Sequence, residues 1–180
     1  MLGKEYLQTA IKRLRYYKLL GDKTFEQLSD ADLHYTPHEA CNSIAVIVQH
    51  LHGNMLSRWT HFLTEDGEKT WRQRDAEFEV HNLSRQELLQ KWEEGWNCLL
   101  NALTALKEDD LLKTITIRQE PLLVIDAINR QLAHYPYHVG QIVHIGKTIR
   151  GTAWKSLSIE KGGSEAYNKG DGIKDPAKGL

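Results

Sequence analysis

The stretch QLAHYPYHVGQIVHIGKTIR, from Gln131 to Arg150, decides how this chain is interpreted. It carries His134 and His138 four residues apart, within an apolar pattern that predicts a long helix. Residues at this spacing lie one above the other on the same helix face, with their Cβ atoms roughly 5–6 Å apart. Two imidazoles placed in this way can bind one metal ion, so the spacing predicts half of a metal site.

A third histidine, His50, is the candidate for the other half of that site. It lies in the apolar segment VIVQHLHGNMLSRW, residues 46–59, where it borders a stripe of positions expected to be buried. His52 is about 200° away around the same helix and is expected to point outward. The chain contains nine histidines, so a pair can arise by chance. On spacing alone, the alternative is that His134 and His138 are half-buried and hydrogen-bonded to the backbone.

Prolines affect both His-x-x-x-His pairs in the sequence. His34 and His38 straddle Pro37 in a segment expected to be a loop, so they are not expected to share a helix face. Pro136 lies between the two histidines of the other pair, where an interior proline removes one backbone hydrogen bond and costs about 3 kcal/mol. Two alternatives follow: the helix breaks at Pro136, or it kinks and continues. The apolar stripe on both sides favours the kink.

Hydrophobic periodicity predicts four long helices and no convincing sheet. They are expected from Leu2 to Leu28, from Asn42 or Ser43 to Leu63, from Ser84 to about Lys107, and from Pro121 to Arg150. This pattern predicts an all-α fold, a four-helix bundle. Residues 1–160 are expected to form its single domain, followed by an irregular Gly- and Lys-rich tail over residues 161–180.

Local signals refine these boundaries. Ser84 and Glu87 form a capping-box pattern, and Pro121 suits the first turn of the last helix. Gly21 is a place where the first helix is expected to bend or break. Thr64 to Asn82 is expected to be a long connection between the second and third helices, of a length that often borders a site. Residues 114–117, Thr-Ile-Thr-Ile, are expected to be extended.

Composition excludes several classes of function. The 180 residues suffice for one domain with a buried core. A net charge of −1 argues against nucleic acid or an anionic membrane as the main partner. The longest apolar run in the front half, Ile44 to Val48, is far short of the ~20 residues that span a bilayer, and the start is not a secretory signal. The expected compartment is the cytoplasm, and the two cysteines, Cys41 and Cys98, do not make a disulfide framework.

Four stretches carry a family resemblance: Ser43 to Leu51, His134 to Ile142, the SDADL segment from Ser29, and Trp154 to Ile159. Together they resemble the DinB-like superfamily, and within it the DUF1572 group, along the chain to about residue 168. The resemblance implies an up-down-down-up four-helix bundle, often a homodimer, in which His50, His134 and His138 hold a divalent metal. Similar proteins include transferases and isomerases that use low-molecular-weight thiols, and others are described as metal-dependent hydrolases. Many members have no known activity.

A site of three neutral imidazoles leaves the full charge of a divalent ion on its open position. With Zn²⁺, the pKa of a bound water falls to ~7, and the same site can keep a low-molecular-weight thiol ionised. Zn and Ni are the expected metals, although imidazole also suits Cu and Fe. The expected function is a metal-dependent enzyme that acts on a small molecule by thiol transfer or hydrolysis. The alternative is a non-catalytic metal-binding or stress-related bundle, and Glu39 and Asp126 are the candidate carboxylates around the metal.

Overall fold

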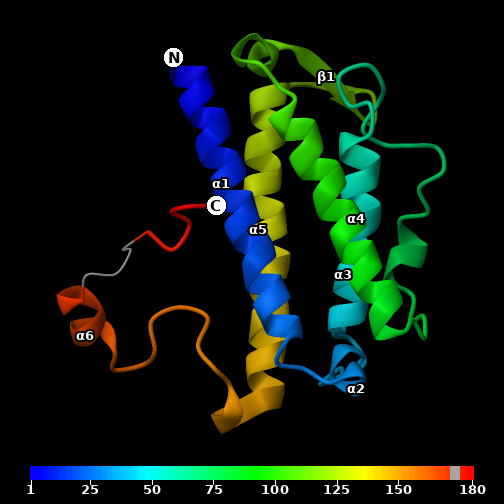
Figure 1. The fold of residues 1–180 in the computed structure, drawn as a ribbon. Helices are drawn as coiled ribbons and strands as arrows, with labels where there is room; N and C mark the ends of the chain where they lie inside the picture. The colour runs from blue at the N-terminus through cyan, green and yellow to red at the C-terminus, as the bar shows by residue number, and fades with distance from the viewer. Residues whose placement is uncertain (171–174) are drawn as a thin grey trace.

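The computed structural model describes residues 1–170 and 175–180, which are mostly helical with one small two-stranded sheet (Figure 1). The long helices are α1 (Leu2–Phe25), α3 (Ile44–Trp59), α4 (Arg85–Thr104) and α5 (Val124–Arg150). The short elements are α2 (Asp30–Leu33), η1 (Asp75–Phe78), η2 (Glu108–Leu112), β1 (Thr114–Ile117), β2 (Glu120–Leu123), η3 (Gly151–Ala153) and α6 (Ser164–Lys169). Helix α1 packs beside α5, and α3 packs beside α4 (Figure 1).

All four long helices contribute buried side chains to one hydrophobic core. Leu14 of α1, Met55 of α3, Trp96 of α4 and Ile128 of α5 are each at most 1 % exposed. Burial of an aliphatic side chain of this size stabilises the fold by roughly 1.5–3 kcal/mol. The apolar stripes that predicted the helices therefore also hold them together.

Serine side chains fix where α3 and α4 begin, as the sequence predicted. The Ser43 hydroxyl accepts a hydrogen bond from the backbone N–H of Val46 at 3.2 Å. Ser84 and Glu87 form the predicted capping box, in which each side chain accepts from the other residue's backbone N–H. Such caps satisfy donors that have no partner inside the helix.

Two helices end earlier than predicted. Helix α3 ends before Leu63, because His61 has a positive φ of 48° that a right-handed helix does not accommodate. Helix α1 ends before Leu28, and the chain then begins α2 with a separate capping box between Ser29 and Asp32. Backbone conformation therefore sets the end of α3, and the cap of the next helix follows the end of α1.

Gly21 lies inside α1, which continues through it as one helix. A Cβ atom at Gly21 would lie 2.3 Å from Cζ2 of Trp92, so the missing side chain makes room for the indole. The same indole donates from Nε1 to the carboxylate of Asp22 at 2.6 Å. The expected break at Gly21 was wrong: the glycine allows a close contact between α1 and α4.

The hairpin of β1 and β2 confirms the extended segment at residues 114–117. Pro121, predicted in the first turn of a helix, instead lies in β2, and α5 begins at Val124. A proline fits there because both strands of a two-stranded sheet are edges. Arg118 and Gln119 have positive φ values of 57° and 67°, as a two-residue turn of type I′ requires.

Helix α5 continues through Pro136 as one helix, so the chain does not break between His134 and His138. It ends where predicted, at Gly151, whose φ is 53°. No atom of the described chain, apart from sequence neighbours and the backbone of α5 itself, lies within 4 Å of a Cβ position at Gly140. Close packing against another described element is therefore not what requires a glycine there.

The end of the predicted tail returns to α1, where Asp175 pairs with Lys12 and Arg13 at 2.8 Å each. Residues 171–174 of that tail lie outside the described residues. Cys41 is exposed and Cys98 is partly buried, and both are free thiols. Within the described residues, no helix combines the length and apolarity needed to cross a bilayer.

Candidate metal centre

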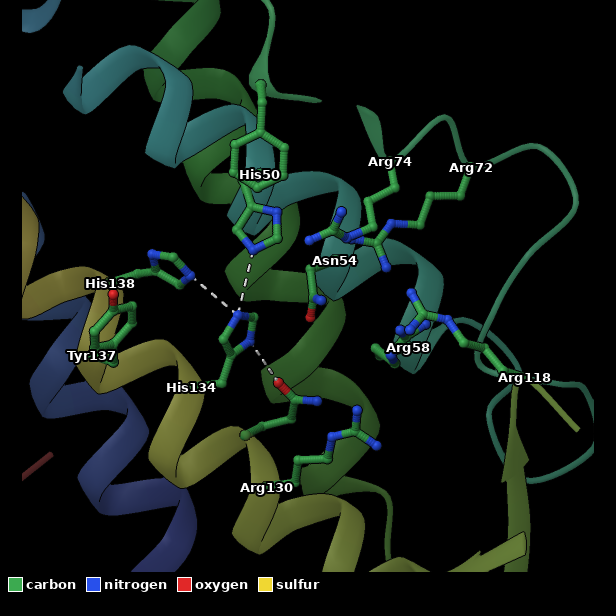
Figure 2. A pocket seen from close by; sticks show the side chains of 12 residues that line it. His50, Asn54, Arg58, Arg72, Arg74, Arg118, Arg130, His134, Tyr137 and His138 are labelled. Carbon is green, nitrogen blue, oxygen red and sulfur yellow. Dashed lines mark hydrogen bonds between the residues drawn. The ribbon is translucent and has the colours of Figure 1, made fainter. Parts of the chain in front are cut away.

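The structure brings together the three histidines that the sequence singled out. His50 extends from α3, and His134 and His138 extend from successive turns of α5 (Figure 2). The Nε2 atom of His134 lies 3.3 Å from Nε2 of His50 and 3.1 Å from Nε2 of His138. One ring nitrogen from each histidine lies within 4.8 Å of the other two, so the group can hold a metal ion.

A buried tyrosine connects the two helices beside this group. Tyr135 follows His134 in the chain and is fully buried. Its hydroxyl donates to Oδ1 of Asn54 at 3.1 Å and accepts from Nε1 of Trp59 at 3.0 Å. Asn54 lies one turn after His50 on α3, so these bonds fix α5 against α3 at the level of the histidines.

The Nδ1 atom of each histidine faces a side-chain oxygen. The pairs are His50 with Glu77 at 3.0 Å, His134 with Gln131 at 3.2 Å, and His138 with Gln141 at 2.8 Å. An oxygen can only accept, so each Nδ1 carries the proton and donates it. In a neutral imidazole the other nitrogen, Nε2, is then left with a free lone pair.

The spacing of the Nε2 atoms fits a cation between them. Lone pairs only 3.1 and 3.3 Å apart repel each other unless a positive centre is shared. Tetrahedral zinc with Zn–N distances of about 2.0–2.1 Å places its nitrogen ligands about 3.3–3.4 Å apart. The donor type, the fixed tautomers and these two distances therefore fit a divalent metal ion.

Burial favours the neutral form of His134 and His138, which is the form that binds metal. Burial, followed by the nearby His138, His50, Arg130 and Arg58, lowers the pKa of His134 to about 3. Burial also lowers the pKa of His138, although the hydrogen bond with Gln141 acts in the opposite direction. Metal binding at neutral pH therefore requires no proton to be removed from either ring.

The long connection between α3 and α4 supplies the partner of His50. Glu77, in η1, binds His50 and also accepts from Nε of Arg72 at 2.7 Å. Burial raises the pKa of Glu77, but the bonds from Arg72 and His50 outweigh burial, so the net pKa is lowered and the carboxylate stays charged. The Phe78 ring stacks on the His50 ring, with centroids 4.7 Å apart. The connection therefore borders the site, as its length indicated.

The prediction of the surrounding carboxylates was wrong. Among the described residues, neither Glu39 nor Asp126 hydrogen-bonds any of the three histidines, whereas Glu77, Gln131 and Gln141 do. Gln131 and Gln141 each lie three residues from the histidine that they orient, so helix spacing could have identified them. Glu77 could not be found in this way, because it is 27 residues from His50 and reaches the ring from an irregular connection.

The structure also agrees with the predictions for His52 and for the pair of His34 and His38. Nε2 of His52 lies 2.8 Å from a carboxylate oxygen of Glu94, so this ring is engaged away from the three histidines, as expected. His34 binds the carbonyl of Leu83 at 2.9 Å, and His38 is exposed in a loop, so this second pair does not share a helix face.

A cavity of about 430 Å³ opens beside the three histidines. Its lining includes five arginines: Arg58, Arg72, Arg74, Arg118 and Arg130 (Figure 2). They come from α3, from the long connection, from the hairpin turn and from α5. The fold thus places the histidine group at the wall of an open, positively charged pocket.

Fold and site together define a mostly helical protein with a three-histidine group that can bind metal. The family model described as "Protein of unknown function (DUF1572)" matches residues 1–163, and the chain belongs to this family. A search of curated proteins finds no match.

Proposed function

We propose that this chain is a divalent-metal-dependent enzyme acting on a small molecule, with the ion held by His50, His134 and His138. An ion held there would have an open position toward the pocket, since the same three histidines line it. The observation that carries the proposal is the convergence of three Nε2 atoms whose ring partners, the Nδ1 atoms, all face acceptors. Zn and Ni are the expected ions, since imidazole suits both.

When bound, the ion supplies Lewis acidity, which keeps a water or a low-molecular-weight thiol ionised near neutral pH. The chain's own residues do the remaining work. Glu77, Gln131 and Gln141 hold the rings in the tautomer that presents Nε2. The guanidinium groups of the pocket stabilise negative charge that develops on a substrate. Hydrolysis and thiol transfer use these roles equally, so the proposal includes both.

The pocket favours this proposal over a non-catalytic, structural metal site. Structural zinc sites have four protein ligands and are closed. Here three histidines meet at the wall of a cavity of about 430 Å³, which is large enough for a small molecule.

The proposed fold class is the DinB-like four-helix bundle with up-down-down-up order, within residues 1–160. In Figure 1, α1 and α5 run in one direction and α3 and α4 run in the other, which supports that order. The homodimer and the cytoplasmic location rest on the family resemblance and on composition. Light scattering of the purified protein tests the dimer, and a mass of one chain would contradict it.

Elemental analysis of the untagged protein tests the metal centre. We expect about one divalent ion per chain, and its loss in His50→Ala, His134→Ala and His138→Ala. His52→Ala is the matched control, because His52 lies on the same helix as His50 but contacts Glu94 instead. Equal metal content in the wild type and all three variants would refute the centre.

A thermal-shift screen separates the two chemistries. Low-molecular-weight thiols are added to the metal-loaded and the metal-free protein. Stabilisation of the metal-loaded form alone favours thiol transfer, because the thiol then needs the ion. No shift with any thiol in either form favours hydrolysis.

A further inference from the structure

Five guanidinium groups gather on one side of the candidate metal centre, where they line the same cavity as the histidines (Figure 2). Two carboxylates bind some of them. Glu68 lies 3.0 Å from Arg58 and 2.9 Å from Arg118, and Glu77 lies 2.7 Å from Arg72. The arginines therefore outnumber their strong partners, and the cavity keeps a positive excess.

Two of the arginines are free to bind a ligand. Among the described residues, Arg130 makes no ion pair, and it lines the cavity one helical turn before His134 on α5. Arg74 lies over the Phe78 ring at 5.4 Å, and its nearest carboxylate, the fully exposed Asp75, is 3.6 Å away. Because water screens an exposed pair of this kind, it holds Arg74 only weakly.

Arg72 carries a buried donor that no described group satisfies. Its side chain is 2 % exposed, and Nη1 has no hydrogen-bond partner. The nearest carboxylate oxygen, on Glu68, is 3.8 Å from Nη1, which is too far for a hydrogen bond. An unsatisfied buried donor of a charged group destabilises the fold, because it has lost its hydrogen bonds to water without replacement. A ligand oxygen in the cavity that Arg72 lines would remove that destabilisation.

The hairpin turn is fixed in the position that brings Arg118 to the cavity. The carboxylate of Asp66 accepts from the backbone N–H groups of Arg118 and Gln119, at 2.8 Å each. Both residues have a positive φ, which is unfavourable for residues other than glycine. The fold therefore accepts local backbone strain at the point where an arginine enters the pocket.

We propose that this arginine-lined cavity binds the oxyanion group of an acidic small molecule, a carboxylate or a phosphate, and presents the rest of that molecule to the three histidines. Planar guanidinium groups bind both kinds of oxyanion with paired hydrogen bonds. This inference rests on the proposed function for the role of the histidines, but the anion site itself needs only the arginines. The proposed substrate class is therefore small molecules that carry a carboxylate or a phosphate.

Isothermal titration calorimetry tests the proposal with three probes: inorganic phosphate, succinate and the uncharged succinamide. Each is titrated into the metal-loaded and the metal-free protein. The variants are Arg130→Gln and Arg74→Gln, which remove charge without breaking a buried ion pair. Arg15→Gln is the control, because Arg15 is exposed on α1 outside the cavity lining. Elemental analysis of each variant runs alongside.

We expect phosphate or succinate, but not succinamide, to bind the wild type. Phosphate binding alone would identify a phosphate site, and succinate binding alone a carboxylate site. Arg130→Gln and Arg74→Gln should each weaken binding about 10- to 100-fold, the range for losing a charge-assisted hydrogen bond. Arg15→Gln should bind as the wild type does, and the metal content of all variants should be unchanged.

Three results would overturn the proposal. These are absence of anion binding, binding of succinamide as tight as that of succinate, or unchanged anion affinity in both cavity variants. The last result, with binding lost in metal-free protein, would mean that the ion alone holds the anion. Anion binding by a wild-type protein that takes up no metal in elemental analysis would support the anion site and refute the proposed metal enzyme. A metal-loaded protein that binds no anion would refute the anion site and leave the metal centre supported.

Discussion

Glu77→Gln should weaken metal binding without replacing any of the three histidines. The Glu77 side chain is 9 % exposed and accepts hydrogen bonds from Nδ1 of His50 at 3.0 Å and from Nε of Arg72 at 2.7 Å. Glutamine has nearly the same shape but only one acceptor oxygen, and its NH₂ group is a donor. At least one of the N–H donors on His50 and Arg72 must therefore face another donor, and the His50 ring loses its fixed orientation or its charged partner.

The expected effect of Glu77→Gln is a loss of metal affinity. Removing the hydrogen-bond partner of a ligating histidine typically lowers metal affinity about 10- to 100-fold, which is about 1.4–2.7 kcal/mol. At a fixed free metal concentration well above both dissociation constants, the metal-dependent stabilisation falls by that amount. For a chain of this size, 1 kcal/mol corresponds to about 2–4 °C in Tm, so the metal-induced rise in Tm should shrink by about 3–11 °C.

The assay is thermal unfolding of the wild type and the variant, with and without ZnCl₂, at equal free zinc. Comparing the two rises in Tm removes a separate effect: the metal-free variant is itself less stable, because Arg72 loses a buried charged partner. Glu79→Gln is the control, since Glu79 is exposed and only two residues away. An equal metal-induced rise in Glu77→Gln and the wild type would refute the role assigned to Glu77.

Two further predictions concern the scaffold. Burial raises the pKa of Asp66, but backbone N–H groups of residues 68, 119 and 118 outweigh it and lower the pKa from 3.8 to about 2. The folded state thus binds the proton less tightly than the unfolded state, so Asp66 contributes stability above pH 3.8 that is lost as the pH falls through about 2. Urea unfolding from pH 5 to pH 2 should show a shallower pH dependence in Asp66→Asn than in the wild type; identical slopes would contradict this. Gly21→Ala should cost about 1–3 kcal/mol, because its Cβ would overlap the Trp92 ring, whereas Gly140→Ala, with open space around it, should stabilise α5 by about 0.5–1 kcal/mol. Urea unfolding measures both, and equal effects of the two substitutions would show that helix propensity alone decides them.

Features that depend on local sequence were predictable. The serine caps of α3 and α4 depend on residues three apart, and the structure contains both. The shared face of His134 and His138 follows from the helix period, and α5 keeps that period through Pro136. Pro121 was misplaced because proline suits both a first helical turn and an edge strand, and only pairing with β1 decides between them.

By itself, the sequence determined four apolar helices and the shared face of His134 and His138, because helix periodicity and capping act between residues a few positions apart. Only the tertiary structure decided which groups from outside α5 surround those histidines. Glu77 reaches His50, and the five arginines reach one cavity, from segments far apart in the chain that have no periodic relation to one another. Their positions follow from how an irregular connection and a hairpin turn pack onto α3 and α5. The charge of the pocket, and with it the class of molecule that we propose it binds, is therefore a property of the folded chain.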